Sequence, residues 1–169
     1  LKMSSLPEHC SLVYPIREGV VVRPDVFAKM LESYLNELLP NTFFNPVELY
    51  VLIPSGLSSA ERENMELAVQ KTGYKDITLI ESVLGLLPIL GSGDRAVCLL
   101  GGGTTEIGVI NDEGILSACT INIAGNTINE KIIDQVLKSY NLRISSSMAE
   151  KLKTGIGSLY DNDISVMTV

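Results

Sequence analysis

The sequence has little of the chemistry on which metal sites and hydrolytic triads depend. It contains one histidine, His9, so a two-histidine metal site is excluded and a Ser-His-Asp or Cys-His hydrolase would have to use His9 as its base. Its three cysteines, Cys10, Cys98 and Cys119, form no Cys-x-x-Cys pair. Because they lie mostly in apolar runs, we expect them to be small buried hydrophobic residues of a protein in a reducing compartment, which favours the cytoplasm.

Positive charge and long apolar runs are also scarce. Thirteen Lys and Arg residues against twenty Asp and Glu residues give a net charge of −7, which is unsuited to binding the phosphate backbone of a nucleic acid. No window approaches the ~20 apolar residues that span a bilayer, and residues 1–10 lack the apolar core and cleavage site of a signal peptide. We therefore expect a globular protein with no nucleic-acid partner, neither secreted nor embedded in a membrane.

Two hydrophobic patterns succeed each other along the chain. Up to residue 100, segments with apolar residues at three- and four-residue steps alternate with short apolar runs, which favours an α/β layer of largely parallel strands over residues 12–100. The expected helices cover residues 24–39, 58–72 and 82–90, and the expected strands cover 48–53, 77–80 and 96–100. Ser58 and Glu61 have the spacing of a capping box at the start of the second helix.

Beyond Gly101 the pattern changes to that of an antiparallel hairpin. The turn residues 111–114 separate two stretches of alternating or apolar residues. After the hairpin, the apolar spacing predicts a helix that ends near Tyr140, a further helix over 147–155, and a strand over 161–169.

The strongest candidate site lies between two apolar strands. Gly101, Gly102 and Gly103, followed by Thr104 and Thr105, offer backbone N–H groups with no Cβ in front of them and two hydroxyl donors. This favours a phosphate-binding turn, and the alternative is a tight turn in which the glycines only permit positive φ. No lysine follows the glycines and a strand follows them in place of a helix, so the segment is neither a P-loop nor a dinucleotide-binding fingerprint.

The chain also resembles the actin superfamily, and most closely the bacterial MreB proteins. The resemblance covers nearly the whole chain, in the family's order. It is carried by PIREGVVV at 15–22, VLIPSGLSSAER at 51–62, ITLIES at 77–82, GGGTTEIGVI at 101–110 and YNLRISSSMAEKLKTGIGSLY at 140–160. It implies an α/β fold of the actin-like (ribonuclease H-like) ATPase kind, of which this chain would be a central fragment spanning parts of both halves.

The resemblance also implies a division of the chain. Residues 1–93 would be the later part of the first actin-like half, 94–142 the phosphate hairpin and helix of the second half, and 143–169 the start of its outer subdomain. The first phosphate hairpin would then precede residue 1, and the adenine-binding segment would follow residue 169.

The site residues implied by the resemblance belong to an ATP site with Mg²⁺. Thr104 would orient the hydrolytic water, and Glu81 is the second catalytic candidate. No metal ligand is assigned. The cofactor-binding residues would be Gly101, Gly102, Gly103, Thr104, Thr105 and Gly125.

Four positions depart from the family pattern. Leu99 stands where the family has an aspartate that helps to hold the metal-bound phosphates, and Ser82 stands where a second glutamate positions the attacking water. Because successive strand residues point to opposite faces, Glu81 replaces that glutamate only if the chain shifts register. The other departures are Asn126, in place of the aspartate of a Gly-Gly-Asp segment, and Gly155, in place of a glutamate that contacts nucleotide. We therefore expect weak or absent ATP hydrolysis.

These implications give an expected function and two alternatives. The expected protein is an MreB-like scaffold for cell shape that self-associates into filaments or oligomers in the cytoplasm. Phe43 and Phe44 match the hydrophobic loop by which MreB filaments touch the inner face of the membrane, and the alternative is that they cap the apolar stripe of helix 24–39. The alternative functions are an active actin-family ATPase or nucleotide switch, and a binding module like the nucleotide domain of the heat-shock chaperones.

Overall fold

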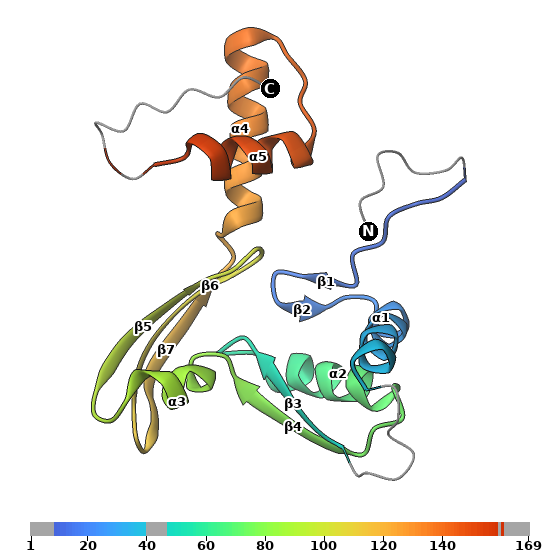
Figure 1. Cartoon of the computed structure of the whole chain (residues 1–169), viewed down its shortest axis with the longest axis vertical. Helices are drawn as coiled ribbons and strands as arrows, with labels where there is room; N and C mark the ends of the chain where they lie inside the picture. The colour runs from blue at the N-terminus through green and yellow to red at the C-terminus, as the bar shows by residue number, and fades with distance from the viewer. Residues whose placement is uncertain (1–8, 40–46, 159, 161–169) are drawn as a thin grey trace. The chain divides into compact units, whose positions relative to one another are not determined.

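The computed structural model describes residues 9–39, 47–158 and 160, which fall into two compact units (Figure 1). Unit 1 is drawn from residues 1–98 and 106–120, and unit 2 from residues 99–105 and 121–169. The strands are β1 (Ile16–Arg17), β2 (Val20–Val21), β3 (Glu48–Ile53), β4 (Asp76–Glu81), β5 (Arg95–Leu100), β6 (Thr105–Asn111) and β7 (Gly114–Ile121). The helices are α1 (Pro24–Leu38), α2 (Ser59–Gln70), η2 (Leu84–Leu86), α3 (Leu87–Leu90), α4 (Gly125–Tyr140) and α5 (Ser146–Ile156). The predicted boundaries, at residue 93 between the two family halves and at residue 142 within the second half, stay predictions.

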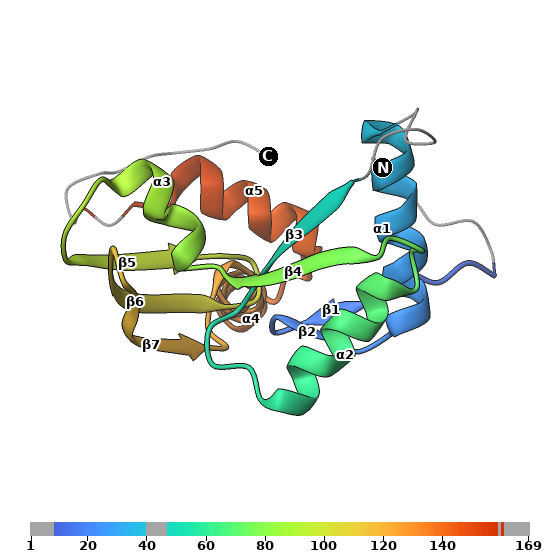
Figure 2. The ribbon, with the colours of Figure 1, turned by 90° about the horizontal axis from the view of Figure 1, so that it is seen from below.

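Unit 1 is built on the parallel pair β3 and β4. The register places Glu48 beside Asp76 at one end and Ile53 beside Glu81 at the other, which confirms the parallel pairing expected for these strands. Helices α1 and α2 pack against each other, and α2 also contacts β4 (Figure 2). The buried core joins side chains of β2, α1, β3 and α2, namely Val21, Phe27, Ile53, Met65, Ala68 and Val69.

Strand β5 does not join this parallel layer, so its expected place is wrong. It is hydrogen-bonded to β6 in a three-stranded sheet of order β5-β6-β7. Only residues 101–104 connect β5 to β6. This connection is too short for the crossover of about a dozen or more residues that parallel neighbours need, so β5 and β6 pair as a hairpin. The predicted hairpin is confirmed: the Asn111 Oδ1 atom accepts hydrogen bonds from the N–H groups of Glu113 at 2.9 Å and Gly114 at 3.2 Å.

The cysteines expected to be buried are exposed, and that prediction is wrong for Cys10, Cys98 and Cys119. Cys98 follows Val97, which is 7% exposed, and side chains alternate between the two faces of a strand. An apolar run such as β5 therefore predicts burial on both faces, whereas the described residues cover only the face that carries Val97.

Unit 2 contains the two predicted helices α4 and α5, which pack against each other (Figure 1). Helix α4 ends as expected after Tyr140, because Asn141 takes the left-handed conformation with φ of 54°. At the start of α5, the Ser145 Oγ atom accepts a hydrogen bond from the Met148 N–H at 3.2 Å. None of the helices in the described ranges is both long and apolar enough to cross a bilayer.

Some sequence predictions fall outside the described residues. These are the strand over 161–169 and the placement of Phe43 and Phe44.

The capping box of α2 is confirmed and gives a stability prediction. Glu61 Oε2 accepts a hydrogen bond from the Ser58 N–H at 2.8 Å, and Ser58 Oγ accepts one from the Glu61 N–H at 3.3 Å. Replacing Ser58→Ala is expected to lower the free energy of unfolding by about 1 kcal/mol, because an N-terminal N–H group loses its acceptor. Chemical denaturation of the two proteins measures the difference.

The same box predicts the pH dependence of that difference. Hydrogen bonds from the Ser58 side chain, and then from its backbone, hold the pKa of the Glu61 carboxyl below its usual range. A lowered folded-state pKa stabilises the protein above the unfolded pKa, and that stabilisation is lost as the pH falls through the folded pKa. The Ser58→Ala deficit should therefore shrink in acid, and a deficit that grows in acid would contradict this assignment.

Candidate functional site

The candidate site is centred on the turn between β5 and β6, residues Gly101–Thr104, called here the glycine turn. The Gly101 N–H donates to the Thr104 carbonyl oxygen at 2.9 Å and closes the turn. Among the described glycines, positive φ occurs at Gly19, Gly56, Gly73, Gly91, Gly93 and Gly114. The glycines of the turn are not among them, so the alternative of glycines that only permit positive φ does not describe this turn.

The glycines of this site serve close approach of backbone to backbone. A Cβ atom added to Gly101 would lie 3.1 Å from the Thr104 carbonyl oxygen, and one added to Gly125 would lie 3.3 Å from the Gly101 carbonyl oxygen. Both distances are shorter than ordinary van der Waals contact. Larger residues at these positions would therefore push the turn away from the segment that begins α4.

Helix α4 begins directly against the glycine turn. The Gly125 N–H donates to the Gly101 carbonyl oxygen at 3.0 Å, and the Asn126 N–H donates to the Gly102 carbonyl oxygen at 2.8 Å. Among the described residues, none accepts a hydrogen bond from the N–H of Gly102 or Gly103. Free N–H groups beside the positive end of a helix of this length are the elements of an anion-binding site.

A lysine from α5 adds a positive charge to this arrangement. The Lys153 Nζ atom donates to the Gly125 carbonyl oxygen at 3.2 Å and to Glu150 Oε2 at 2.6 Å. It also lies 3.2 Å from the position that a Cβ of Gly125 would occupy. Lys153 therefore holds its ammonium group next to the residue on which the glycine turn rests.

The Lys153 side chain is held by a hydrogen-bond network between α4 and α5, in which Glu150 accepts from both Lys153 and Asn129. The Asn129 Nδ2 atom donates to Glu150 Oε2 at 2.7 Å, and Asn129 is 4% exposed. Hydrogen bonds from Lys153, and then from Asn129, hold the pKa of the Glu150 carboxyl below its usual range. Glu150 is therefore ionised at neutral pH and orients the ammonium group.

Lys153 was not predicted as a site residue from the sequence. The spacing of Glu150 and Lys153 on α5 is that of an ordinary solvent-exposed ion pair. Only the packing of α5 on α4 shows that the pair reaches Gly125.

The two threonines of the candidate site differ in availability. The Thr105 Oγ1 atom donates to the Ile123 carbonyl oxygen at 2.6 Å, so its hydroxyl proton is committed within the protein. Thr104 is half-buried, and its hydroxyl has no hydrogen-bond partner among the described residues. Of the two predicted hydroxyl donors, Thr104 is the one whose proton is free for a ligand.

The predicted catalytic carboxylate Glu81 lies at the end of β4 in unit 1. Its Oε1 atom is 4.0 Å from the Arg62 Nη1 atom of α2. The next residue, Ser82, donates from its Oγ atom to the Ile53 carbonyl oxygen at 3.0 Å. Glu81 thus pairs with Arg62 of α2, and Ser82 is hydrogen-bonded to Ile53 of β3. A catalytic role for Glu81 stays a prediction.

One carboxylate that the sequence analysis did not single out is buried in unit 1. Glu106 is 5% exposed, and its Oε2 atom accepts a hydrogen bond from the Ser55 N–H at 2.8 Å. The signal was an acidic residue in the otherwise apolar strand that follows Thr105.

The fit of an ATP site with Mg²⁺ is mixed. The glycine turn, the start of α4 and Lys153 fit a phosphate group, because they combine free N–H donors, space without a Cβ and a positive charge. The described residues contain no group of three or more His, Cys, Asp or Glu side chains that could hold a metal ion. Leu99 offers no oxygen ligand, so these residues do not fit Mg²⁺ held by protein ligands.

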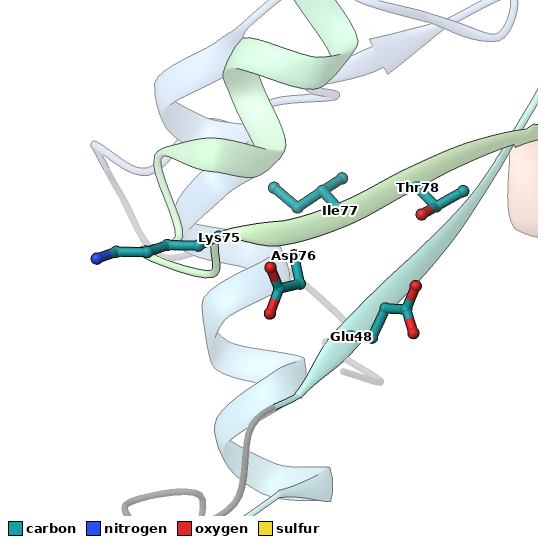
Figure 3. Close-up of a pocket in the computed structure, with 5 residues that line it drawn as sticks. All are labelled: Glu48, Lys75, Asp76, Ile77 and Thr78. Atoms are coloured by element: carbon teal, nitrogen blue, oxygen red, sulfur yellow. The ribbon is translucent and has the colours of Figure 1, made fainter.

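A separate cavity of about 500 Å³ lies at the amino end of the β3 and β4 pair (Figure 3). It is lined by Glu48, Lys75, Asp76, Ile77 and Thr78. Glu48 and Asp76 are register partners, and the Lys75 side chain extends away from both in Figure 3. Two carboxylates with no inward-facing cation do not suit an anion, so this cavity is not the phosphate site.

A family model and the curated relatives agree on one family. The family model described as "MreB/Mbl protein" matches residues 3–168. The cell shape-determining protein MreB of Escherichia coli strain K12 is 30% identical over 163 residues, which cover 93% of this chain and 47% of that protein. The chain thus spans about half the length of the curated relatives it matches.

Solved structures share the fold. MreB5 of Spiroplasma citri bound to ADP superposes with a TM-score of 0.76 at 25% identity, over 89% of this chain and 47% of that one. A MamK double helical filament superposes with a TM-score of 0.64 at 17% identity, over 83% of this chain and 46% of that one.

Proposed function

The chain belongs to the MreB/Mbl family of actin-like proteins, and on this premise we propose that the whole protein is a bacterial actin homologue that forms a cytoskeletal scaffold for cell shape in the cytoplasm. The proposal is supported by the relative in Escherichia coli, which is a cell shape-determining protein. It is also supported by the actin-like fold shared with MreB5.

The site is proposed to bind the phosphates of ATP or ADP. The observation that carries this proposal is the convergence of the glycine turn, the start of α4 and Lys153, with the Gly125 N–H on Gly101 and the Lys153 ammonium on the Gly125 carbonyl oxygen. The related MreB5 was solved with ADP bound. In this chain, the free N–H groups of Gly102 and Gly103 would donate to phosphate oxygens, and the Thr104 hydroxyl would reach the same group.

Hydrolysis of that nucleotide is proposed to be weak or absent. Leu99 cannot hold or orient a metal-bound phosphate, and the hydroxyl of Ser82 is a poor base that is bonded to the Ile53 carbonyl oxygen. Loss of one positioned base alone typically lowers a rate by ~10²–10⁴-fold. The protein would therefore use nucleotide as a ligand that stabilises one conformation.

Self-association follows from the proposed scaffold. The MamK filament has the same fold, so a filament is the assembly proposed here. Sedimentation of the full-length protein with and without ATP tests it. Pelleting that does not depend on nucleotide would support a scaffold with a degenerate site, whereas rapid phosphate release during assembly would contradict it.

Contact with the inner face of the membrane is proposed for Phe43 and Phe44. Changing both to serine is expected to lower the fraction that co-sediments with lipid vesicles by about tenfold, because a fully buried phenylalanine contributes ~1.5–3 kcal/mol. Tyr34→Ser is the control, since this aromatic residue of α1 is 57% exposed and lies outside the loop. Equal losses in both variants would contradict the assignment.

A further inference from the structure

The loop after β3 is held to the hairpin by two side chains that bind the same residue, Ser55. The Glu106 Oε2 atom accepts a hydrogen bond from the Ser55 N–H at 2.8 Å, and the Thr120 Oγ1 atom donates to the Ser55 carbonyl oxygen at 2.6 Å. Glu106 and Thr120 come from β6 and β7. Together they are called here the Ser55 clamp, and all three residues lie in unit 1.

The clamp is buried, and its carboxylate has no cation. Ser55 is 1% exposed and Glu106 is 5% exposed. The ion pairs of the described chain are Arg62 with Glu81, Lys71 with Asp25, and Lys153 with Glu150, so Glu106 takes part in none of them. A buried carboxylate is costly unless fixed donors solvate it, and the position of Glu106 is therefore tied to that of the Ser55 N–H.

Glu106 of the clamp lies on β6, two residues beyond the last residue of the glycine turn. Thr105 and Glu106 are neighbours in this strand, so their side chains point to opposite faces. Thr105 is bonded to Ile123 of unit 2, and Glu106 is bonded to Ser55 of unit 1. The boundary between the two units crosses β6 between these residues and crosses β7 between Thr120 and Ile121.

We propose that Glu106 and Thr120 are positioning residues that couple the glycine turn to the end of β3. This rests on the proposed nucleotide function of the turn. A shift of the turn when phosphate binds passes along β6 to Glu106 and from its carboxylate to the Ser55 N–H. Two residues before Ser55, the Ile53 carbonyl oxygen accepts hydrogen bonds from the N–H and Oγ of Ser82, so the shift reaches the end of β4 as well.

Hydrogen exchange at single amides tests the coupling in the full-length protein. Without nucleotide, Glu106→Ala is expected to speed exchange of the Ser55 amide by about tenfold or more, and to speed exchange of the glycine turn in the same direction. Glu106→Gln should rescue both, because its amide oxygen still accepts from the Ser55 N–H. Glu113→Ala, in the exposed hairpin turn, is the matched control and should change neither.

A second arm adds ATP with Mg²⁺. In the wild type, ATP is expected to protect both the glycine turn and the Ser55 amide from exchange. In Glu106→Ala, the glycine turn should still be protected, and the Ser55 amide should not. Equal protection at Ser55 in both proteins, or unchanged exchange of the glycine turn in nucleotide-free Glu106→Ala, would overturn the coupling. If ATP protects nothing in the wild type, the proposed nucleotide function fails, and the nucleotide-free arm still decides whether the clamp couples the two segments.

Discussion

Introducing carboxylates at the two positions proposed to have lost them, with Leu99→Asp and Ser82→Glu together, is expected to raise the rate of ATP hydrolysis by the full-length protein by about 10²–10⁴-fold. The physical reason is that a positioned base and a metal-orienting carboxylate each act on the transition state of phosphoryl transfer. Phosphate release at saturating ATP and Mg²⁺ measures the rate.

The control for this change is Leu100→Asp combined with Ser82→Ala. Leu100 follows Leu99 on β5 and is 66% exposed, so this variant places the strand's new aspartate on the opposite face of β5 and adds no charge at position 82. Loss of the Ser82 hydroxyl is common to both proteins, which separates its structural effect from the gain of a base. An unchanged rate in the Leu99→Asp and Ser82→Glu protein would mean that degeneracy at these positions does not limit turnover.

Replacing Lys153→Met is expected to weaken the binding of ADP or ATP by about 10–100-fold. A hydrogen bond to a charged group contributes ~1.5–3 kcal/mol, and Lys153 places its charge beside Gly125. Titration calorimetry, or the rise of the melting temperature with nucleotide concentration, measures the affinity.

Lys151→Met is the matched control, because Lys151 is an exposed lysine two positions away on the same helix. The unliganded melting temperatures of both variants report any loss of folding, since Lys153 also pairs with Glu150. Equal affinities of the two variants would show that nucleotide does not use the Lys153 ammonium.

Local signals in the sequence predicted most of the elements. The apolar spacing over 24–39 predicted α1, and the capping pair Ser58 and Glu61 predicted the start of α2. The turn at 111–114 predicted the hairpin between β6 and β7. These features were predictable because each depends on residues a few positions apart. The pairing of β5 was not, since an apolar strand carries no mark of the neighbour that it selects.

The candidate site was predicted only where it is local. The glycine turn is a contiguous motif, so its residues could be named from the sequence. Lys153 and Glu106 could not be assigned, because their roles depend on contacts 28 residues away at Gly125 and 51 residues away at Ser55. The exposure of Cys98 was missed for a related reason: burial of a strand face depends on which other segments cover it.

The glycine turn is proposed to bind nucleotide without hydrolysing it efficiently. Measuring ATP binding by calorimetry and phosphate release on the same sample of the full-length protein tests both parts of this proposal at once. We expect saturable binding that Lys153→Met weakens, with phosphate release at least about 10²-fold slower than in the Leu99→Asp and Ser82→Glu protein. Absence of ATP binding, or release by the unmodified protein as fast as by that variant, would contradict it.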